Sequence, residues 1–443
     1  MAVGLSRREK ARAHSLRAGS RQFPEGDVQH WWLPETGAGT RTRISDDAAW
    51  LTYCTMHYVS VTNDAAILDE ALPFLEGRVL EPAEHDAYFP PHVSDRTASL
   101  YEHCCIGLEH SLTRGPHGLP LIGGGDWNDG LNRVGEKGRG ESTWLAWFLI
   151  ATLKTILPES ERRGDTARIT RWKDAIKSLT TAVEKHGWDG AWYRRGYFDD
   201  GTPLGSKDSS ECRIDVIAQS WSVLAGTAAP DRAASAIAEV RKQLIRPEDG
   251  LALLFTPPFD SSQPDPGYIR AYPPGLRENG GQYSHGAIWS VFALMQLGQV
   301  DEAVSLFNQL NPVNHARTSE DAARYKVEPY VMVADIYSVA PHVGRGGWTW
   351  YTGAAAWLYR AGIEAVLGLS WDGDAVRVSP RLPTGWDRTR VTVRRGKARL
   401  QITIVRGGVE PGAMDGLQKL NDAQWRISFP RDESVREIEF PSQ

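Results

Sequence analysis

The sequence GGGDWNDGLNRVGEKGRGESTWLAWFLIATLKTIL, residues 123–157, joins a glycine-rich polar loop directly to an apolar helix. Three consecutive glycines disfavour helix and strand, and they let the backbone turn tightly and approach a ligand closely. The second half has the apolar spacing of a helix. Its apolar run contains Lys154 and is too short to span a bilayer. A long polar loop followed by a helix recurs along the chain, and this repeat is the basis of the predicted fold.

The helical period dominates the chain from Arg7 to about Leu369. Some connections between the helices are short, and others are long and rich in Gly, Pro and aromatic residues, as functional loops often are. Long connections at alternate links are typical of helix hairpins arranged in a ring. The sequence therefore predicts a mainly α fold, an (α/α) barrel over residues 1–370. The expected helices are 8–21, 46–61, 64–75, 97–113, 141–157, 169–185, 211–225, 231–244, 283–297, 301–308 and 350–367.

The period changes to two after about Trp371. Alternating segments are separated by turns rich in Gly, Pro and Asp, which indicates strands. In ARLQITIV, residues 398–405, Leu400, Ile402 and Ile404 fall on one face. We therefore predict a small C-terminal β-domain over residues 371–443, with strands at 374–378, 388–394, 398–405, 425–429 and 435–440.

Composition excludes several classes of protein. The chain has 443 residues, 24% of them charged, and a formal net charge of -5, which indicates neither a nucleic-acid surface nor a polybasic membrane patch. No stretch suits membrane insertion, and the N-terminus lacks the apolar core of a signal peptide. Its 4 cysteines have no metal-type spacing and are expected to be reduced thiols. A cytoplasmic protein is expected.

The loop at Gly123–Asn132 carries the residue types of a sugar site. Asp126 and Asp129 supply carboxyl groups, Asn128 a polar amide and Trp127 a flat aromatic face. A glycosidic oxygen needs an acid to protonate it, and a sugar ring needs polar partners and an apolar surface. The alternative is an ordinary Asp/Asn-rich surface turn. The chain's 17 tryptophans, many of them beside Gly, Asp or Asn, suggest flat faces for a sugar ring, and ordinary core packing of large residues is an equal alternative.

Two helix starts have the composition of anion sites. His285 enters a helix after Arg-Glu-Asn-Gly-Gly, residues 277–281, and Thr352 and Gly353 begin another. Free N–H groups and the helix dipole favour an anion at such positions. The alternatives are a buried histidine bonded to a carbonyl and a simple threonine cap. For a fourth cluster, 326–335, core packing before a helix is favoured. No metal or nucleotide motif occurs, so no cofactor is expected.

Taken together these clusters resemble glycoside hydrolase family 94, the inverting β-glucoside phosphorylases, and most closely its branch of cyclic β-1,2-glucan synthases and β-1,2-oligoglucan phosphorylases. The motifs that carry the resemblance run in order through most of the chain. They are EGDVQHWW at 25–32, RTRISDD at 41–47, YEHC at 101–104, GGGDWNDGLNRVGEKGRGES at 123–142, WYRRGYFDDGTPLGS at 192–206, PPGLRENGGQYSH at 273–285, YKVEPYV at 325–331 and PHVGRGGWTWYTGAAAW at 341–357.

The resemblance implies phosphorolysis of a β-glucoside, with a β-1,2-glucan or oligoglucan as substrate and α-glucose 1-phosphate as product. Phosphate replaces the activated water of an inverting hydrolase, so one acid and one anion site are enough. By motif position Asp126 matches the general acid, and His285, Thr352 and Gly353 match the phosphate site. Trp127, Asn128, Asp129 and Glu278 are expected to line the sugar subsites. Inorganic phosphate is then a co-substrate, and no cofactor is implied.

Family members are usually longer, and the comparison implies a six-hairpin (α/α)6 toroid that lacks its first helix here. An upstream donor-site segment is expected to be missing, which would leave this chain weakly active. A separate N-terminal polypeptide or a homodimer would then be a partner. Two other functions stay open, a catalytically impaired carbohydrate-binding fragment and an inverting glycoside hydrolase.

Overall fold

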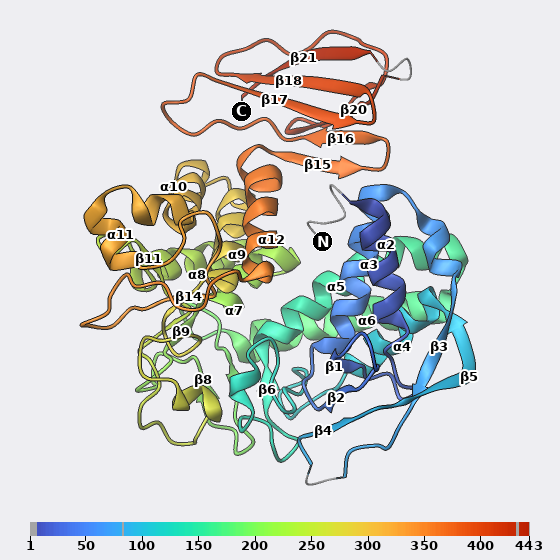
Figure 1. The fold of residues 1–443 in the computed structure, drawn as a ribbon, viewed down its shortest axis with the longest axis vertical. Coiled ribbons are helices and arrows are strands. Elements are labelled where there is room, and N and C mark those ends of the chain that lie inside the picture. The colour runs from blue at the N-terminus through green and yellow to red at the C-terminus, as the bar shows by residue number, and fades with distance from the viewer. Residues whose placement is uncertain (1–6, 82–83, 431–433, 443) are drawn as a thin grey trace.

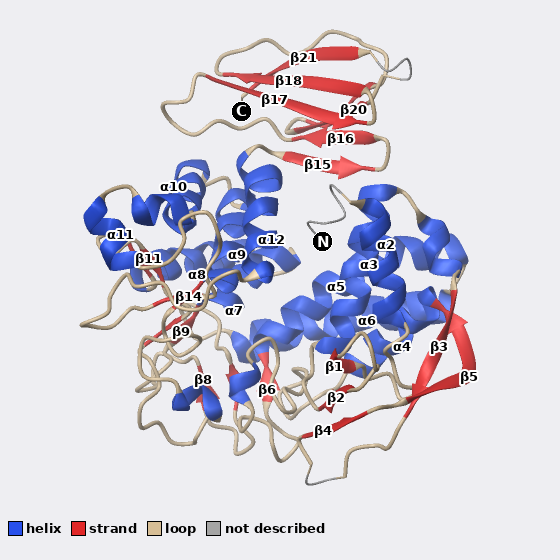
Figure 2. Ribbon diagram, viewed as in Figure 1, coloured by secondary structure: helices blue, strands red, loops and turns tan. Residues whose placement is uncertain are grey.

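The computed structural model describes residues 7–81, 84–430 and 434–442. Helices and long loops make up the chain to about residue 368, and strands follow (Figures 1 and 2). This arrangement confirms the expected helix-rich fold with strands at the C-terminus. The first six residues of the N-terminal segment, which was examined for a signal sequence, lie outside the described residues.

Five helices pack consecutively and form the inner layer of the helical part. Helices α5 and α9 are buried over most of their surface, because apolar residues occupy nearly every face. The series runs from α3 to α12 as an arc, and the described residues contain no closed barrel (Figure 1). The inner helices are α3 (Asp47–Thr62), α5 (Thr143–Arg163), α7 (Val216–Ala225), α9 (Ser284–Gln296) and α12 (Thr352–Arg360).

An outer layer of amphipathic helices covers this arc. Helices α4, α6, α8 and α10 each pack on the inner helix that precedes them in the chain. Local signals set their limits: Pro230 is the first residue of α8, and Gly164, with a φ of 70°, ends α5. The outer helices are α2 (Arg8–Gly19), α4 (Leu100–Ser111), α6 (Thr166–Ala182), α8 (Pro230–Gln243) and α10 (Val300–Leu310), and a short α11 (Ser319–Tyr325) follows α10.

Large aromatic side chains fill the space between the inner helices. Trp221 is 1% exposed and its ring contacts those of Trp144 and Trp289, which are fully buried. Trp31, Trp348 and Trp350 are instead at least 47% exposed, on loops or a short strand. The tryptophans therefore divide between core packing and the surface, as the two interpretations of their number allowed.

Two expected helices are wrong in part. Residues 64–75 form a single turn, Ala65–Asp69, followed by the strand β3 (Ala71–Glu76). Pro73 cannot continue a helix, and this segment pairs with β5 (His92–Ser99). Consequently the next helix begins at Leu100, where Ser99 Oγ accepts from the Glu102 amide at 3.2 Å. Residues 326–335 also lead into a short strand, β14 (Asp335–Ile336), and not into a helix.

Short strands support the loops at one end of the helical part. A three-stranded sheet consists of β1 (Gln29–Trp32), β2 (Gly39–Thr42) and β4 (Asp86–Phe89). Two-residue strands sit at the starts of several inner helices and tie the loops together in pairs. They are β6 (Glu141–Ser142), β7 (Gly196–Tyr197), β8 (Pro203–Leu204), β9 (Ile214–Asp215), β10 (Ile245–Arg246), β11 (Leu251–Ala252), β12 (Phe255–Thr256) and β13 (Gln282–Tyr283).

The C-terminal strands form two sheets around a second hydrophobic cluster, with orders β15-β16-β20-β19 and β17-β18-β21. Leu400, Ile402 and Ile404 are at most 1% exposed, which confirms the inward face expected for β18. The strands are β15 (Leu369–Asp372), β16 (Ala375–Val378), β17 (Arg388–Arg395), β18 (Ala398–Val405), β19 (Leu417–Asn421), β20 (Gln424–Ser428) and β21 (Val435–Pro441).

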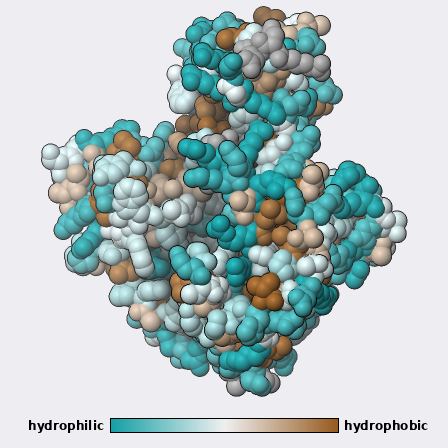
Figure 3. All heavy atoms as spheres, turned by 45° about the vertical axis from the view of Figure 1, so that its right-hand side comes forward, coloured by the Kyte–Doolittle hydropathy of each residue, from teal (hydrophilic) through white to brown (hydrophobic). Residues whose placement is uncertain are grey.

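Hydrophilic residues cover most of the face in Figure 3, and hydrophobic patches lie between the helical part and the C-terminal sheets. In the part of the chain that the structure describes, every helix is too short or too polar to cross a membrane.

We expect Trp221→Ala to lower the free energy of unfolding by about 3–5 kcal/mol, because it leaves a cavity among packed rings. Trp386→Ala is the matched control, since Trp386 is 40% exposed. Urea denaturation followed by circular dichroism measures both variants. Equal transition midpoints would show that the rings around Trp221 do not form a tightly packed core.

Candidate active site

The loop at Gly123–Asn132 is fixed against the segment that leads into α3. The Gly124 amide donates to the Arg43 carbonyl at 2.9 Å, and the Ser45 amide donates to the Gly125 carbonyl at 2.9 Å. A Cβ on Gly123, whose φ is 61°, would lie 2.3 Å from the Arg43 oxygen. Only glycine permits this contact, so the glycine run brings the acidic loop against residues 43–47.

Asp126 points into the protein. Its side chain is fully buried, and both carboxylate oxygens bond the guanidinium of Arg195, one of them at 2.7 Å. Ser142 Oγ donates to Asp126 Oδ2 at 2.6 Å, and Asp215 Oδ2 lies 3.4 Å from Arg195 Nε. These bonds tie the loop to the starts of α5 and α7. A carboxylate held in this way is poorly placed to reach a sugar, which argues against Asp126 as the general acid.

Asp129 is the carboxyl group that the loop presents outward. Its side chain is 43% exposed, and its Oδ2 lies 3.4 Å from His30 Nε2. The other nitrogen of His30, Nδ1, lies 2.9 Å from Asp47 Oδ2 at the start of α3. The loop therefore separates two carboxylates with similar local sequence into one buried and one accessible group.

Trp127 connects this carboxylate to the predicted phosphate residues. Its indole Nε1 donates to His285 Nδ1 at 3.4 Å, and its ring contacts that of Tyr283 edge to face. A Cβ on Gly353 would lie 3.8 Å from His285 Nδ1. The hydroxyls of Tyr283 and Tyr351 are 2.7 Å apart and link the starts of α9 and α12. His285, Thr352 and Gly353, distant in sequence, thus lie around one position.

His285 is electrically neutral near pH 7, because burial lowers its pKa to about 3. Its Nε2 is buried and, among the described residues, has no hydrogen-bond partner. A buried N–H without a partner costs about 1–3 kcal/mol, so an incoming acceptor would recover that energy. Whether His285, Thr352 and Gly353 bind phosphate stays a prediction.

Glu278 lies on a different side of the candidate site, next to Arg277. Its Oε2 lies 3.5 Å from Arg277 Nε, and burial raises the pKa of its carboxyl group. The Arg277 guanidinium lies over the rings of Tyr272 and Trp348, 5.2 Å from each ring centre. Asn128 is 3% exposed, and its backbone N–H donates to Asp126 Oδ1. Asn128 therefore supports the loop more than it lines an open surface.

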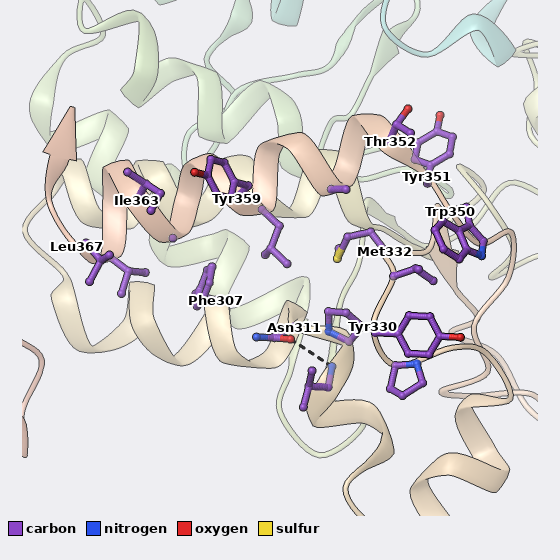
Figure 4. A pocket seen from close by; sticks show the side chains of 18 residues that line it. Phe307, Asn311, Tyr330, Met332, Trp350, Tyr351, Thr352, Tyr359, Ile363 and Leu367 are labelled. Atoms are coloured by element: carbon purple, nitrogen blue, oxygen red, sulfur yellow. Dashed lines mark hydrogen bonds between the residues drawn. The ribbon is translucent and has the colours of Figure 1, made fainter. Parts of the chain in front are cut away.

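An apolar groove of 720 Å³ runs along α12 beside this polar site. Phe307, Tyr359 and Ile363 line one end, and Tyr330 and Trp350 the other (Figure 4). The apolar groove and the polar site meet at Tyr351 and Thr352, whose hydroxyls point away from the groove in Figure 4. The groove has few polar groups, so the chemistry belongs to the polar side.

Sequence reasoning missed His30, Asp47, Arg195, Tyr283 and Tyr351. All five lie within the motifs that carry the family resemblance. Several of them make their contacts with residues 68 to 99 positions away in the sequence. The Arg195–Asp126 pair, for example, spans 69 positions. Among the described residues, no group of three or more His, Cys, Asp and Glu could hold a metal ion.

The chain was compared with known proteins. The model of the glycosyl hydrolase 94 superfamily, catalytic domain, matches residues 1–368. A cyclic beta-(1,2)-glucan synthase, NdvB, of Rhizobium meliloti (strain 1021) is 50% identical over 92% of this chain and 14% of its own length. A cellobionic acid phosphorylase of Neurospora crassa is 29% identical over 83% of this chain and 44% of its own. The chain thus spans less than half of either relative.

A solved structure, a rhamnosidase from Klebsiella oxytoca with rhamnose bound, matches with a TM-score of 0.50 and 14% identity. The match covers 83% of this chain and 56% of that one. At this identity the likeness concerns the fold alone.

We expect Asp126→Asn to lower the free energy of unfolding by about 3–5 kcal/mol, because it removes the two-oxygen partner of the buried Arg195 guanidinium and leaves it the longer contact with Asp215. Asp129→Asn, the matched change three residues along, should alter stability by about 0.5 kcal/mol or less, as exposed substitutions usually do. Chemical denaturation compares the two. A similar loss in both variants would contradict the different roles that burial gives these carboxylates.

Proposed function

Because this chain belongs to the glycosyl hydrolase 94 superfamily, we propose that it catalyses inverting phosphorolysis of a β-glucoside. The proposed substrate is a β-1,2-linked glucan or oligoglucan, as the name of its relative with 50% identity suggests, and the product is α-glucose 1-phosphate. Inorganic phosphate is the co-substrate, and no further cofactor is proposed. We also propose that the helix arc belongs to an (α/α)6-type toroid, that residues 1–370 form the catalytic domain, and that the protein acts in the cytoplasm.

One observation carries the proposal: Trp127 lies in the same loop as an accessible carboxylate and contacts His285, a member of the proposed anion site. Asp129 follows Trp127 by two residues, and the Trp127 indole lies 3.4 Å from His285 Nδ1. Inverting phosphorolysis needs an acid on the leaving oxygen and a phosphate on the opposite side of the sugar. The proposal gives the first role to Asp129 and the second to the residues around His285, which the Trp127 indole contacts.

We assign the role of general acid to Asp129, in place of the Asp126 that motif position alone suggested. Asp129 protonates the glycosidic oxygen while a phosphate oxygen attacks the anomeric carbon. His285, Thr352 and Gly353 hold the phosphate through neutral N–H and O–H donors and the start of α12. Trp127 and Glu278 face the sugar, and Asn128 holds the loop.

The first test incubates the protein with β-1,2-oligoglucans, with and without phosphate, and assays glucose 1-phosphate. Asp129→Asn should reduce turnover by about 10²–10⁴-fold, the usual contribution of a general acid. The sugar KM should change little, because the shape of the side chain is kept. Turnover within a few-fold of wild type would exclude Asp129 as the acid.

The same assay separates the alternatives. Release of free sugar that does not depend on phosphate would support an inverting hydrolase. Binding of the oligoglucan without any product would support a carbohydrate-binding fragment. If adding a polypeptide from the N-terminal part of a relative restored turnover, a partner in trans would be indicated.

A second test addresses the anion site directly. Phosphate should raise the pKa of His285 from its value of about 3, because a nearby anion favours the protonated imidazole. Histidine nuclear magnetic resonance follows this titration, with chloride at equal ionic strength as the control. An unchanged His285 titration in phosphate would contradict the assignment.

A further inference from the structure

His30 lies between two carboxylates that come from different parts of the chain. It belongs to β1, and its imidazole Nδ1 is 2.9 Å from Asp47 Oδ2. Its Nε2 is 3.4 Å from Asp129 Oδ2. The side chain is 26% exposed, so water reaches it only in part. Asp47 is the closer partner and fixes the ring, and the second nitrogen is left facing Asp129.

The surroundings of His30 are strongly acidic. Asp46 and Asp47 come from the start of α3, and Asp126 and Asp129 from the glycine-rich loop. Arg195 neutralises Asp126 at the buried end. Burial, together with the neighbouring carboxylates, raises the pKa of Asp46. Positive charge on His30 is therefore favoured, because it faces Asp47 and Asp129 and no other described cation is bonded to either of them.

The hydrogen bonds to Asp129 and Asp47 raise the pKa of His30 to about 10, against the opposite effect of burial. The pKa rises because the protonated ring is a cation that gains anionic partners. The imidazolium therefore persists through neutral pH and is lost only as the pH rises towards 10. Thr42 Oγ1, 3.5 Å from Asp47 Oδ2, is the uncharged neighbour on β2.

We propose that His30 is a positioning residue that orients the Asp129 carboxyl group and stabilises the carboxylate that remains when Asp129 gives up its proton. The proposal rests on the function proposed above for Asp129. It goes further by naming an Asp47–His30–Asp129 chain, in which Asp47 anchors the imidazole and Asp129 is the group that meets the sugar.

The proton balance follows from the reaction. Asp129 gives its proton to the leaving oxygen as the glycosidic bond breaks and a hydrogen phosphate oxygen bonds the anomeric carbon. The imidazolium keeps its protons and stabilises the Asp129 carboxylate that remains. The sugar phosphate forms as a monoanion that still carries the hydrogen phosphate proton. It releases that proton to water at neutral pH, and Asp129 takes up a proton from water before the next turnover.

The first arm of the test needs no turnover. Nitrogen-15 histidine spectra of the whole chain should show His30 protonated on both nitrogens at pH 8. Asp129→Asn and Asp47→Asn should each lower its pKa, and the second should also free the ring to rotate. His92→Gln, a change at an exposed histidine on β5, is the control and should leave the His30 signal unchanged. A His30 that titrates near its ordinary pKa of about 6.5 and ignores both variants would overturn the proposal.

The second arm uses the phosphorolysis assay. His30→Gln should lower kcat by roughly 10-fold or more, a part of the contribution of the acid itself. It should leave the phosphate KM almost unchanged and shift the alkaline limb of the pH profile. Imidazole in the buffer should restore part of the rate of His30→Gly. A uniform loss at every pH without rescue would indicate a merely structural role and contradict the proposal.

The two arms separate the two hypotheses. If the protein shows no phosphorolysis at all, the proposed function fails, and the spectra still decide whether the Asp47–His30–Asp129 chain exists. If phosphorolysis occurs and His30 behaves like an isolated histidine, the function stands and the positioning role of His30 is wrong. If His30→Gln does not fold, Asp47→Asn is used in its place for both the histidine spectra and the phosphorolysis assay.

Discussion

The buried pair between Arg195 and Asp126 is the interaction on which the arrangement of the site depends. Both side chains are at most 1% exposed, and Ser142 and Asp215 complete the network at the starts of α5 and α7. Isolated charges cannot remain in such an environment, so each partner requires the other. Because this pair holds Asp126 inward, the next residues of the loop turn outward, and Trp127 and Asp129 face the site.

The same region gathers the N-terminal ends of all the inner helices. Asp47 opens α3, Ser142 caps α5, Asp215 caps α7, and His285 and Thr352 begin α9 and α12. Each helix start carries free N–H groups and a partial positive charge. Such a centre stabilises carboxylates and an incoming anion without a metal ion or a cluster of lysines. A formal net charge of -5 is therefore compatible with the phosphate site proposed above.

Charge is graded across this centre. Asp126 is neutralised by Arg195, Asp129 shares His30 with Asp47, and His285 is neutral in a buried position. A general acid must keep or regain its proton. An anion site must instead lack negative charge of its own and stabilise the negative charge of the ligand. In the proposed mechanism Asp129 meets the first requirement and the residues around His285 meet the second. The carboxyl groups are chemically alike, so the differences between them come from how deeply each is buried and from which side chain it contacts.

The sequence by itself determined the helical period to residue 368, the change to strands after it, and the loops that carry the chemistry, because these depend on local spacing and on glycine. It placed His285, Thr352 and Gly353 at helix starts for the same local reason. Only the tertiary structure distinguished the buried Asp126 from the accessible Asp129, which share one loop and one residue type, because the burial of Asp126 depends on its bond to Arg195, 69 positions away. The positions of His30 and Asp47, and the strand at 71–76 with its partner 92–99, likewise depend on contacts between distant segments, and local pattern does not encode such contacts.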